Sequence, residues 1–109
     1  VLRKLNIDES EFSIMTDRAK MAILEVLLTM GSHASVPVLR RHTDIERAFG
    51  RKVGRQLLHY HLSALAEKKK YVGKVGSYYF AKPPATKLIQ KYKALLEEAG
   101  SFIDLRSVF

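Results

Sequence analysis

Two histidines flank a tyrosine in the segment LLHYHLSAL, and they are the first residues to consider for catalysis or metal binding. The leucines around them recur at helical spacing, which predicts that His59 and His61 lie on one helix. Residues two positions apart on an α-helix project about 200° from each other, so these two histidines cannot share one metal ion. We therefore predict no metal site and no catalytic pair here.

The rest of the sequence shows no other recognisable catalytic or metal-binding pattern. The chain has no cysteine, which excludes disulfides, thiolate metal sites and cysteine nucleophiles. The motifs G-x-S-x-G, H-E-x-x-H and G-x-x-x-x-G-K-[ST] are absent. His33 and His42 lie on separate segments, and the acidic residues form no convincing pair. We expect a protein that is not an enzyme, with no catalytic residue, no metal and no cofactor.

Positive charge is concentrated in the middle third of the 109-residue chain. The formal net charge is +8, and residues 40–74 alone hold ten basic and three acidic side chains, a net of +7. Residues 1–39 sum to −1 and residues 75–109 to +2. A local excess of this kind attracts polyanions through Coulomb forces and counterion release. Nucleic acid is therefore the favoured partner, and a merely solubilising helix face is the alternative.

Residues 52–69 are predicted to form an amphipathic helix whose polar face can enter the major groove of double-stranded DNA. Its inward side holds Val53, Leu58, Leu62 and Leu65, and its outward side holds Arg55, Gln56, His59, Tyr60 and Ser63. Arginine pairs bidentately with guanine and glutamine with adenine, and the other outward residues can donate to phosphates or bases. Leu57 lies at the boundary, where it either contacts a thymine methyl or joins the core.

The spacing of the apolar residues changes after this helix, and the new pattern predicts a small β-hairpin. The runs YVGKV and YYFA are rich in β-forming residues and are joined at Gly76-Ser77, which suits a type II′ turn with glycine first. Lys74 and Ser77 near the tip are expected to reach a neighbouring minor groove or the phosphate backbone. The full set of candidate DNA contacts is Arg51, Lys52, Arg55, Gln56, His59, Tyr60, Ser63, Lys70, Lys74 and Ser77.

Three tyrosines in and beside the hairpin allow a second interpretation. Tyr71, Tyr78 and Tyr79 either form a stacking platform for single-stranded bases or pack the hairpin on the core, and we favour packing. A binder of single strands or RNA is thus a rival class of protein. Competition between single- and double-stranded oligonucleotides would distinguish it.

The segments before this surface are expected to support it. Residues 1–15 form an arm or short helix that packs on the domain or on a partner. A helix follows from an N-cap at Thr16 to Gly31, with apolar residues at three- and four-residue steps. A second helix begins at Ser35, with Pro37 in its first turn.

A third short helix is expected to begin with a capping box formed by Thr43 and Glu46 and to stop at Gly50. One continuous helix with a bend is the alternative for this region. Either arrangement places the polar helix after a helix–turn segment.

A long amphipathic helix is predicted after Pro83-Pro84, opening at Ala85 or Thr86 and closing at Gly100. The tail that follows, SFIDLRSVF, is too apolar to be left in water, so we expect it to be buried at a subunit contact. The candidate dimer interface is Leu88, Ile89, Tyr92, Leu95, Leu96 and Phe102.

The stretch VGRQLLHYHLSAL, residues 53–65, resembles the recognition helix of small winged helix-turn-helix regulators, especially the ArsR-like S-H-H-L-x-x-L pattern. Its segment 60–62 and Leu65 match the H-H-L and final L positions. The family's DNA-reading positions fall on Arg55, Gln56, His59 and Tyr60. A winged domain followed by a long terminal helix also resembles PadR-like and MarR-like proteins, whose pattern implies two-fold dimers. The resemblance covers roughly residues 16–99.

The resemblance implies an α+β, mainly α fold, a winged helix-turn-helix with a small β-hairpin wing and a C-terminal dimerisation helix. Residues 1–15 are then an N-terminal arm, 16–82 the DNA-binding domain, and 83–109 the dimerisation helix and tail. The expected function is that of a homodimeric transcription regulator reading a pseudo-palindromic site. Two features depart from the ArsR-like pattern: Gly54 replaces a capping serine, and no cysteine or histidine cluster matches its metal-sensing sites.

Two further functions fit the same residues. The chain also resembles small archaeal plasmid and viral proteins, including PadR-like centromere-binding adaptors that act in plasmid segregation and spread along DNA. A protein-interaction module would instead use the terminal helix and apolar tail on an additional partner. No apolar run approaches the roughly 20 residues that span a bilayer, and no signal-peptide pattern is visible. We expect a cytoplasmic protein with no membrane partner.

Overall fold

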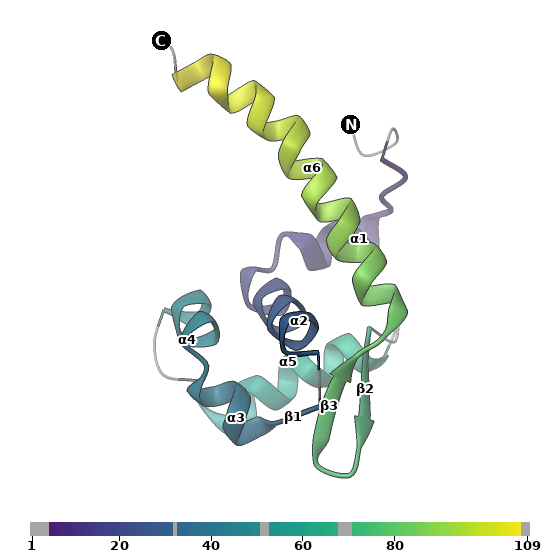
Figure 1. Ribbon diagram of the computed structural model, residues 1–109, viewed down its shortest axis with the longest axis vertical. Helices are drawn as coiled ribbons and strands as arrows, with labels where there is room; N and C mark the ends of the chain where they lie inside the picture. The colour runs from purple at the N-terminus through teal and green to yellow at the C-terminus, as the bar shows by residue number, and fades with distance from the viewer. Residues whose placement is uncertain (1–4, 32, 51–52, 68–70, 108–109) are drawn as a thin grey trace.

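The computed structural model of the chain describes residues 5–31, 33–50, 53–67 and 71–107, with side chains through Glu98. This part of the chain is α+β and mostly helical, with a small antiparallel sheet (Figure 1). The helices are α1 (Glu9–Met15), α2 (Arg18–Met30), α3 (Val36–Arg41), α4 (Thr43–Phe49), α5 (Arg55–Glu67) and α6 (Pro83–Ser107). The strands are β1 (Ala34–Ser35), β2 (Val72–Val75) and β3 (Tyr78–Ala81).

Helix α2 is the centre of the molecule and contacts α1, α4, α5, β3 and α6. Five of its thirteen residues are buried: Met21, Ile23, Leu24, Val26 and Leu27. It ends at Gly31, as predicted, but its N-cap is Asp17 and not Thr16. The Asp17 carboxylate accepts from the Lys20 amide at 3.1 Å, whereas Thr16 terminates the preceding α1.

Helices α3 and α4 are separate, so the alternative of one bent helix is wrong. His42 between them has an extended backbone, and its Nδ1 accepts from the Asp44 amide at 3.2 Å. His42 is thus the N-cap of α4, and Thr43 is its first helical residue, which excludes the predicted capping box. Gly50 ends α4 as expected. Two short helices hold the chain in a tight turn against α2 and α5.

The sheet has the strand order β1-β3-β2, with both pairs antiparallel. The β2–β3 hairpin and its turn at Gly76-Ser77 were predicted. Gly76 has φ +60° and Ser77 does not have a positive φ, which matches glycine in the first position of a type II′ turn. Strand β1 was not predicted. It is two residues long and pairs Ala34 with Tyr79, so it anchors the hairpin to the chain just before α3.

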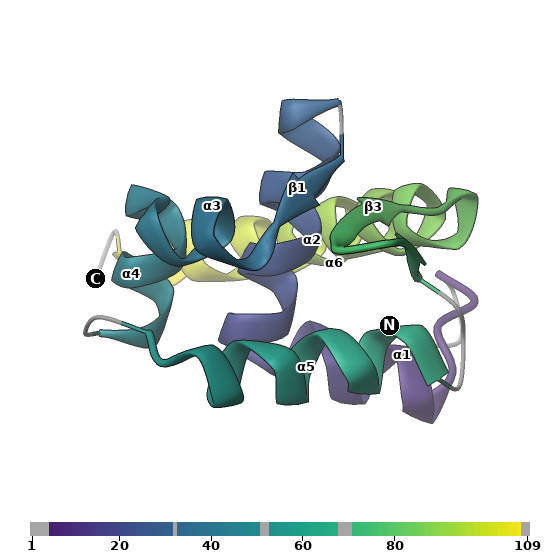
Figure 2. The same ribbon diagram turned by 90° about the horizontal axis from the view of Figure 1, so that it is seen from below.

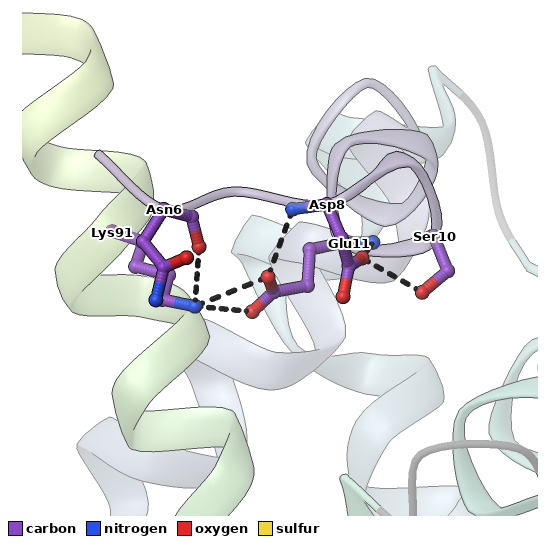
Figure 3. Close-up of polar contacts among 5 residues, drawn as sticks. All are labelled: Asn6, Asp8, Ser10, Glu11 and Lys91. Carbon is purple, nitrogen blue, oxygen red and sulfur yellow. Dashed lines mark hydrogen bonds and ion pairs between the residues drawn. The ribbon is translucent and has the colours of Figure 1, made fainter. Parts of the chain in front are cut away.

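The N-terminal segment packs on its own chain. Ile7 and Met15 belong to the same core cluster as the residues of α2, α5 and α6. Lys91 of α6 donates to the Asn6 carbonyl oxygen at 2.9 Å and to both carboxylate oxygens of Glu11 at 2.9 and 3.1 Å (Figure 3). One core therefore draws on all three parts into which the sequence was divided.

Helix α6 is longer than predicted at both ends. It starts at Pro83, because two prolines fit a first turn where the amides need no intrahelical acceptor, and it continues through Gly100 to Ser107. Its first turns are anchored by the buried Ala85, Leu88 and Ile89. The rest projects away from the end that carries α3, α5 and the hairpin (Figure 1). Among the described residues, no helix is both long and apolar enough to cross a membrane.

Candidate nucleic-acid interface

Helix α5 has one buried side and one uncovered polar side. Leu58, Leu62 and Leu65 are at most 1% exposed and hold the helix to the core, together with Val53 just before it. The predicted outward residues are all exposed: Arg55, Gln56, His59, Tyr60 and Ser63. Leu57 is half-buried, at the boundary where the spacing places it. The periodic pattern therefore gave the correct orientation of this helix.

The start of α5 is fixed from α3. The Arg40 Nε donates to the Val53 carbonyl oxygen at 2.9 Å, across the turn that leads into α5. The Gly54 carbonyl accepts from the Leu58 amide at 3.2 Å, so Gly54 lies immediately before the helix. Sequence analysis gave Arg40 no such role, because a contact between residues thirteen positions apart carries no periodic signal.

The hairpin lies near the other end of α5. Viewed from below, α5 runs across the molecule from the side of α3 and α4 to the side of the hairpin, and it contacts both α3 and β2 (Figure 2). Lys74 and Ser77 are exposed on the hairpin, as predicted. The cross-strand pair Val75 and Tyr78 is also exposed, at 59% and 53%. His59 of α5 and Lys74 of β2 both lie against Tyr79, so the candidate surface continues from α5 onto the hairpin.

The two histidines of α5 have different surroundings. His59 is exposed, and its Nδ1 lies 3.5 Å from the Tyr79 hydroxyl. His61 is half-buried against Phe49, with ring centroids 5.4 Å apart, and its buried Nδ1 has no hydrogen-bond partner among the described residues. Burial lowers the pKa of His61, and the Lys20 ammonium lowers it further, whereas the Asp17 carboxylate opposes them. No three histidine or acidic side chains in the described ranges come together as a metal site.

The three tyrosines do not form one platform. Tyr71 and Tyr79 are buried, at 3% and 5% exposed, and pack the hairpin on the core. Burial raises the pKa of Tyr71 to about 12, and the Glu11 and Asp8 carboxylates act in the same direction. Tyr78 is exposed, so the stacking arrangement of all three residues is excluded.

Comparison with known proteins does not assign this arrangement. No protein-family model, curated protein or solved structure matches the chain.

The basic residues of segment 40–74 are only partly described. Arg51, Lys52 and Lys70 lie outside the described residues, as do Lys68 and Lys69. Arg40, Arg41, Arg47, Arg55 and Lys74 are described and exposed. Arg47 lies 3.6 Å from the Asp44 carboxylate, which partly neutralises it. Lys20 of α2, not considered from the sequence, extends toward α5, where its Nζ lies 5.8 Å from the centre of the Tyr60 ring.

The predicted dimer residues divide into three groups. Leu88 and Ile89 are 0% and 7% exposed in the core of their own chain, so assigning them to a dimer interface was wrong. Tyr92 and Leu95 are half-buried against that core, and Leu96 is 50% exposed. Phe102 belongs to α6, but its side chain lies outside the described part.

A groove beside Tyr92 was not visible in the sequence. It has a volume of about 670 Å³ and lies among the end of α1, α2, α4 and α6. Its walls include Arg18, Glu25 and Thr29 of α2 and Asp44 and Arg47 of α4. Every exposed side chain of α2 therefore lines this groove.

Proposed function

We propose that the chain is a winged helix-turn-helix protein that binds double-stranded DNA as a homodimer and acts as a transcription regulator. Helix α5 is the recognition helix, and the β2–β3 hairpin is the wing. The observation that carries the proposal is the exposed polar face of α5, which adjoins Lys74 of the hairpin because His59 and Lys74 both lie against Tyr79. The resemblance of residues 53–65 to a recognition helix supports it.

In this mechanism the leucines of α5 hold the helix while its outer side chains enter the major groove. Arg55 and Gln56 near its start are the base-reading residues, because their side chains can form two parallel hydrogen bonds with guanine and adenine. His59, Tyr60 and Ser63 contact bases or phosphates farther along. Lys74 and Ser77 contact the flanking backbone and add affinity with little sequence information.

The homodimer is proposed to form through the part of α6 beyond the core. Leu96 is half-exposed and lies one helical turn after Tyr92, which lines the groove. A two-fold pair would place two copies of α5 in successive major grooves about 34 Å apart. Such symmetry requires a pseudo-palindromic site.

Selection of bound duplexes from a random library tests the function directly. An enriched inverted repeat supports a two-fold dimer that reads sequence, whereas enriched tandem repeats favour the segregation role. Affinity for the selected duplex should fall steeply between about 50 and 200 mM salt, since each neutralised phosphate adds about 0.9 to the log–log slope. Failure to bind any duplex would reject the proposal and favour a protein-interaction module.

Light scattering on Leu96→Glu tests the dimer. A charge at this exposed apolar position should yield a monomer if α6 forms the contact, because a carboxylate would be desolvated there. Gln90→Glu adds the same charge at another exposed position of α6 and is the control. If the Leu96→Glu protein stays dimeric, the dimer interface does not include this part of α6.

A further inference from the structure

Tyr79 contacts two candidate DNA-binding residues that belong to different elements. Its hydroxyl lies 3.5 Å from Nδ1 of His59 on α5. The ammonium of Lys74 on β2 lies 5.5 Å from the centre of its ring. Tyr79 itself is only 5% exposed, so it can touch DNA little, and it is fixed by pairing with Lys74 in the hairpin and with Ala34 of β1. The residue is therefore a fixed point between α5 and the hairpin.

The direction of the hydrogen bond between Tyr79 and His59 determines which ring nitrogen of His59 can donate elsewhere. A neutral imidazole carries one proton, and the partner of one nitrogen selects the nitrogen that bears it. If the Tyr79 hydroxyl donates to Nδ1, the proton of His59 resides on Nε2. If the ring is protonated, Nδ1–H donates to the tyrosine oxygen, and Nε2–H is still a donor. The opposite neutral tautomer, with Nδ1–H donating to the tyrosine oxygen, would leave Nε2 an acceptor, so Nε2 of the neutral ring donates only where the Tyr79 hydroxyl is the donor.

We propose that Tyr79 is a positioning residue that orients His59 on the recognition helix, so that Nε2–H of His59 donates to an acceptor on DNA. This inference rests on the proposed function and deepens it. The acceptor is either a base-edge atom in the major groove or a phosphate oxygen. Lys74 over the face of the same ring adds an oriented cation beside His59. Tyr79 in this way holds the wing and the recognition helix in one relative arrangement.

The Tyr79→Phe variant removes the hydroxyl and keeps the ring. The buried aromatic side chain and the cation–π contact with Lys74 remain, so the fold and the number of phosphate contacts should be unchanged. Affinity for the selected duplex should fall about three- to tenfold, the effect of losing one hydrogen bond of ordinary strength. The slope of affinity against salt should stay at its wild-type value. A general loosening of the hairpin would instead reduce that slope.

A double-mutant cycle with His59→Ala shows whether Tyr79 acts through His59. In the His59→Ala background, Tyr79→Phe should change affinity by less than about twofold, because the residue to be oriented is gone. Tyr71→Phe removes another buried tyrosine hydroxyl, away from the proposed DNA contacts. This control should bind as the wild type does.

The ¹⁵N chemical shifts of the His59 imidazole provide a readout that needs no DNA. The wild-type protein should show an accepting Nδ1 and a protonated Nε2 when neutral, and Tyr79→Phe should shift both signals toward a tautomer mixture. Repeating the duplex selection with Tyr79→Phe then separates the two acceptors. If the sequence preference relaxes at one base position, the acceptor of the His59 hydrogen bond is a base edge. If the preference is unchanged and the affinity is weaker, the acceptor is a phosphate.

The outcomes separate this inference from the function on which it rests. If the wild-type protein binds no duplex, the proposed function fails. If it binds and Tyr79→Phe binds equally well, the function stands and the positioning role is overturned. A full effect of Tyr79→Phe in the His59→Ala background also overturns it, because Tyr79 would then act by another route.

Discussion

Helices α2 and α5 have the same length, thirteen residues, but differ in what covers them. α2 buries five residues at the centre of the fold, whereas α5 buries three residues and leaves its polar face uncovered. The exposed side chains of α2 all line a groove of its own chain. Those of α5 face outward as one surface. The first helix is therefore a scaffold, and the second has a side available for a ligand.

This difference teaches that amphipathicity alone does not separate a structural helix from a binding helix. Both helices have an apolar stripe at helical spacing. What distinguishes α5 is the chemistry of its free side, where Arg55, Gln56 and His59 offer hydrogen-bonding groups and Leu57 is the only large aliphatic residue that is not buried. Mutations should therefore separate the stability that α2 supplies from the DNA affinity that we propose for α5.

The largest effect should come from the core of α2. Leu24 is 0% exposed, so Leu24→Ala removes buried methyl groups and leaves a cavity. We expect a loss of about 2–5 kcal/mol in the free energy of unfolding, measured by denaturant titration. Ser63→Ala on the exposed side of α5 should stay within about 0.5 kcal/mol of wild type. A Leu24→Ala protein of nearly wild-type stability would contradict the scaffold role of α2.

The next largest effect should be a loss of DNA affinity caused by substitutions on α5. Arg55→Ala and Gln56→Ala should each weaken binding to the selected duplex by about 1–3 kcal/mol, because each removes a proposed base contact, and should change binding to random DNA little. Gln90→Ala, the same change at an exposed position of α6, is the matched control. Fluorescence anisotropy with both duplexes measures the difference. Equal losses on both duplexes would make Arg55 and Gln56 phosphate contacts.

The sequence predicted those parts of the fold that have a strong local signal. The leucine spacing gave the orientation of α5, and Gly76-Ser77 gave the hairpin turn. Strand β1 was missed because two residues have no period, and it forms only when β3 supplies a partner. The predicted N-caps of α2 and α4 were each wrong by one residue, because the side chains of Asp17 and His42 can also accept a hydrogen bond from a first-turn amide.

The exposure of the described candidate residues was predictable from the sequence, but their contacts with one another were not. Exposure of His59 follows from helical spacing, whereas its contact with Tyr79 joins residues twenty positions apart. The apolar stripe of α6 shows the corresponding difficulty. Leu88 and Leu96 share that stripe, yet one is in the core of its own chain and the other is half-exposed. Periodicity identifies a buried face but not the molecule that buries it.

The junction between α2 and α5 should respond to pH. Burial and the Lys20 ammonium lower the pKa of His61 below its ordinary 6.5, with Asp17 opposing. The unfolded chain therefore binds this proton more tightly than the folded chain does. The contribution of neutral His61 to the free energy of unfolding is therefore fully present above pH 6.5 and is lost as the pH falls below that value.

Unfolding free energies at about pH 7.5 and about pH 5.5 test this sign in the wild-type protein, His61→Phe and His61→Gln. The unfolding free energy should decrease less between these two pH values in both variants than in the wild type, because neither variant titrates at this position. Variants that keep the whole decrease would assign it to other groups.

The smallest effect concerns the start of each helix. Asp17 caps α2 through its side chain, whereas Gly54 before α5 has no side chain to accept from the first amides. A Cβ at Gly54 would meet no atom within 4 Å, so a side chain fits there. Gly54→Ser should raise the free energy of unfolding by a few tenths of a kcal/mol, about 1–3 °C in Tm, because the hydroxyl can accept from an early α5 amide. Gly54→Ala adds the Cβ without the oxygen and should not stabilise. Equal gains in both variants would mean that reduced backbone freedom in the unfolded chain, and not capping, causes the effect.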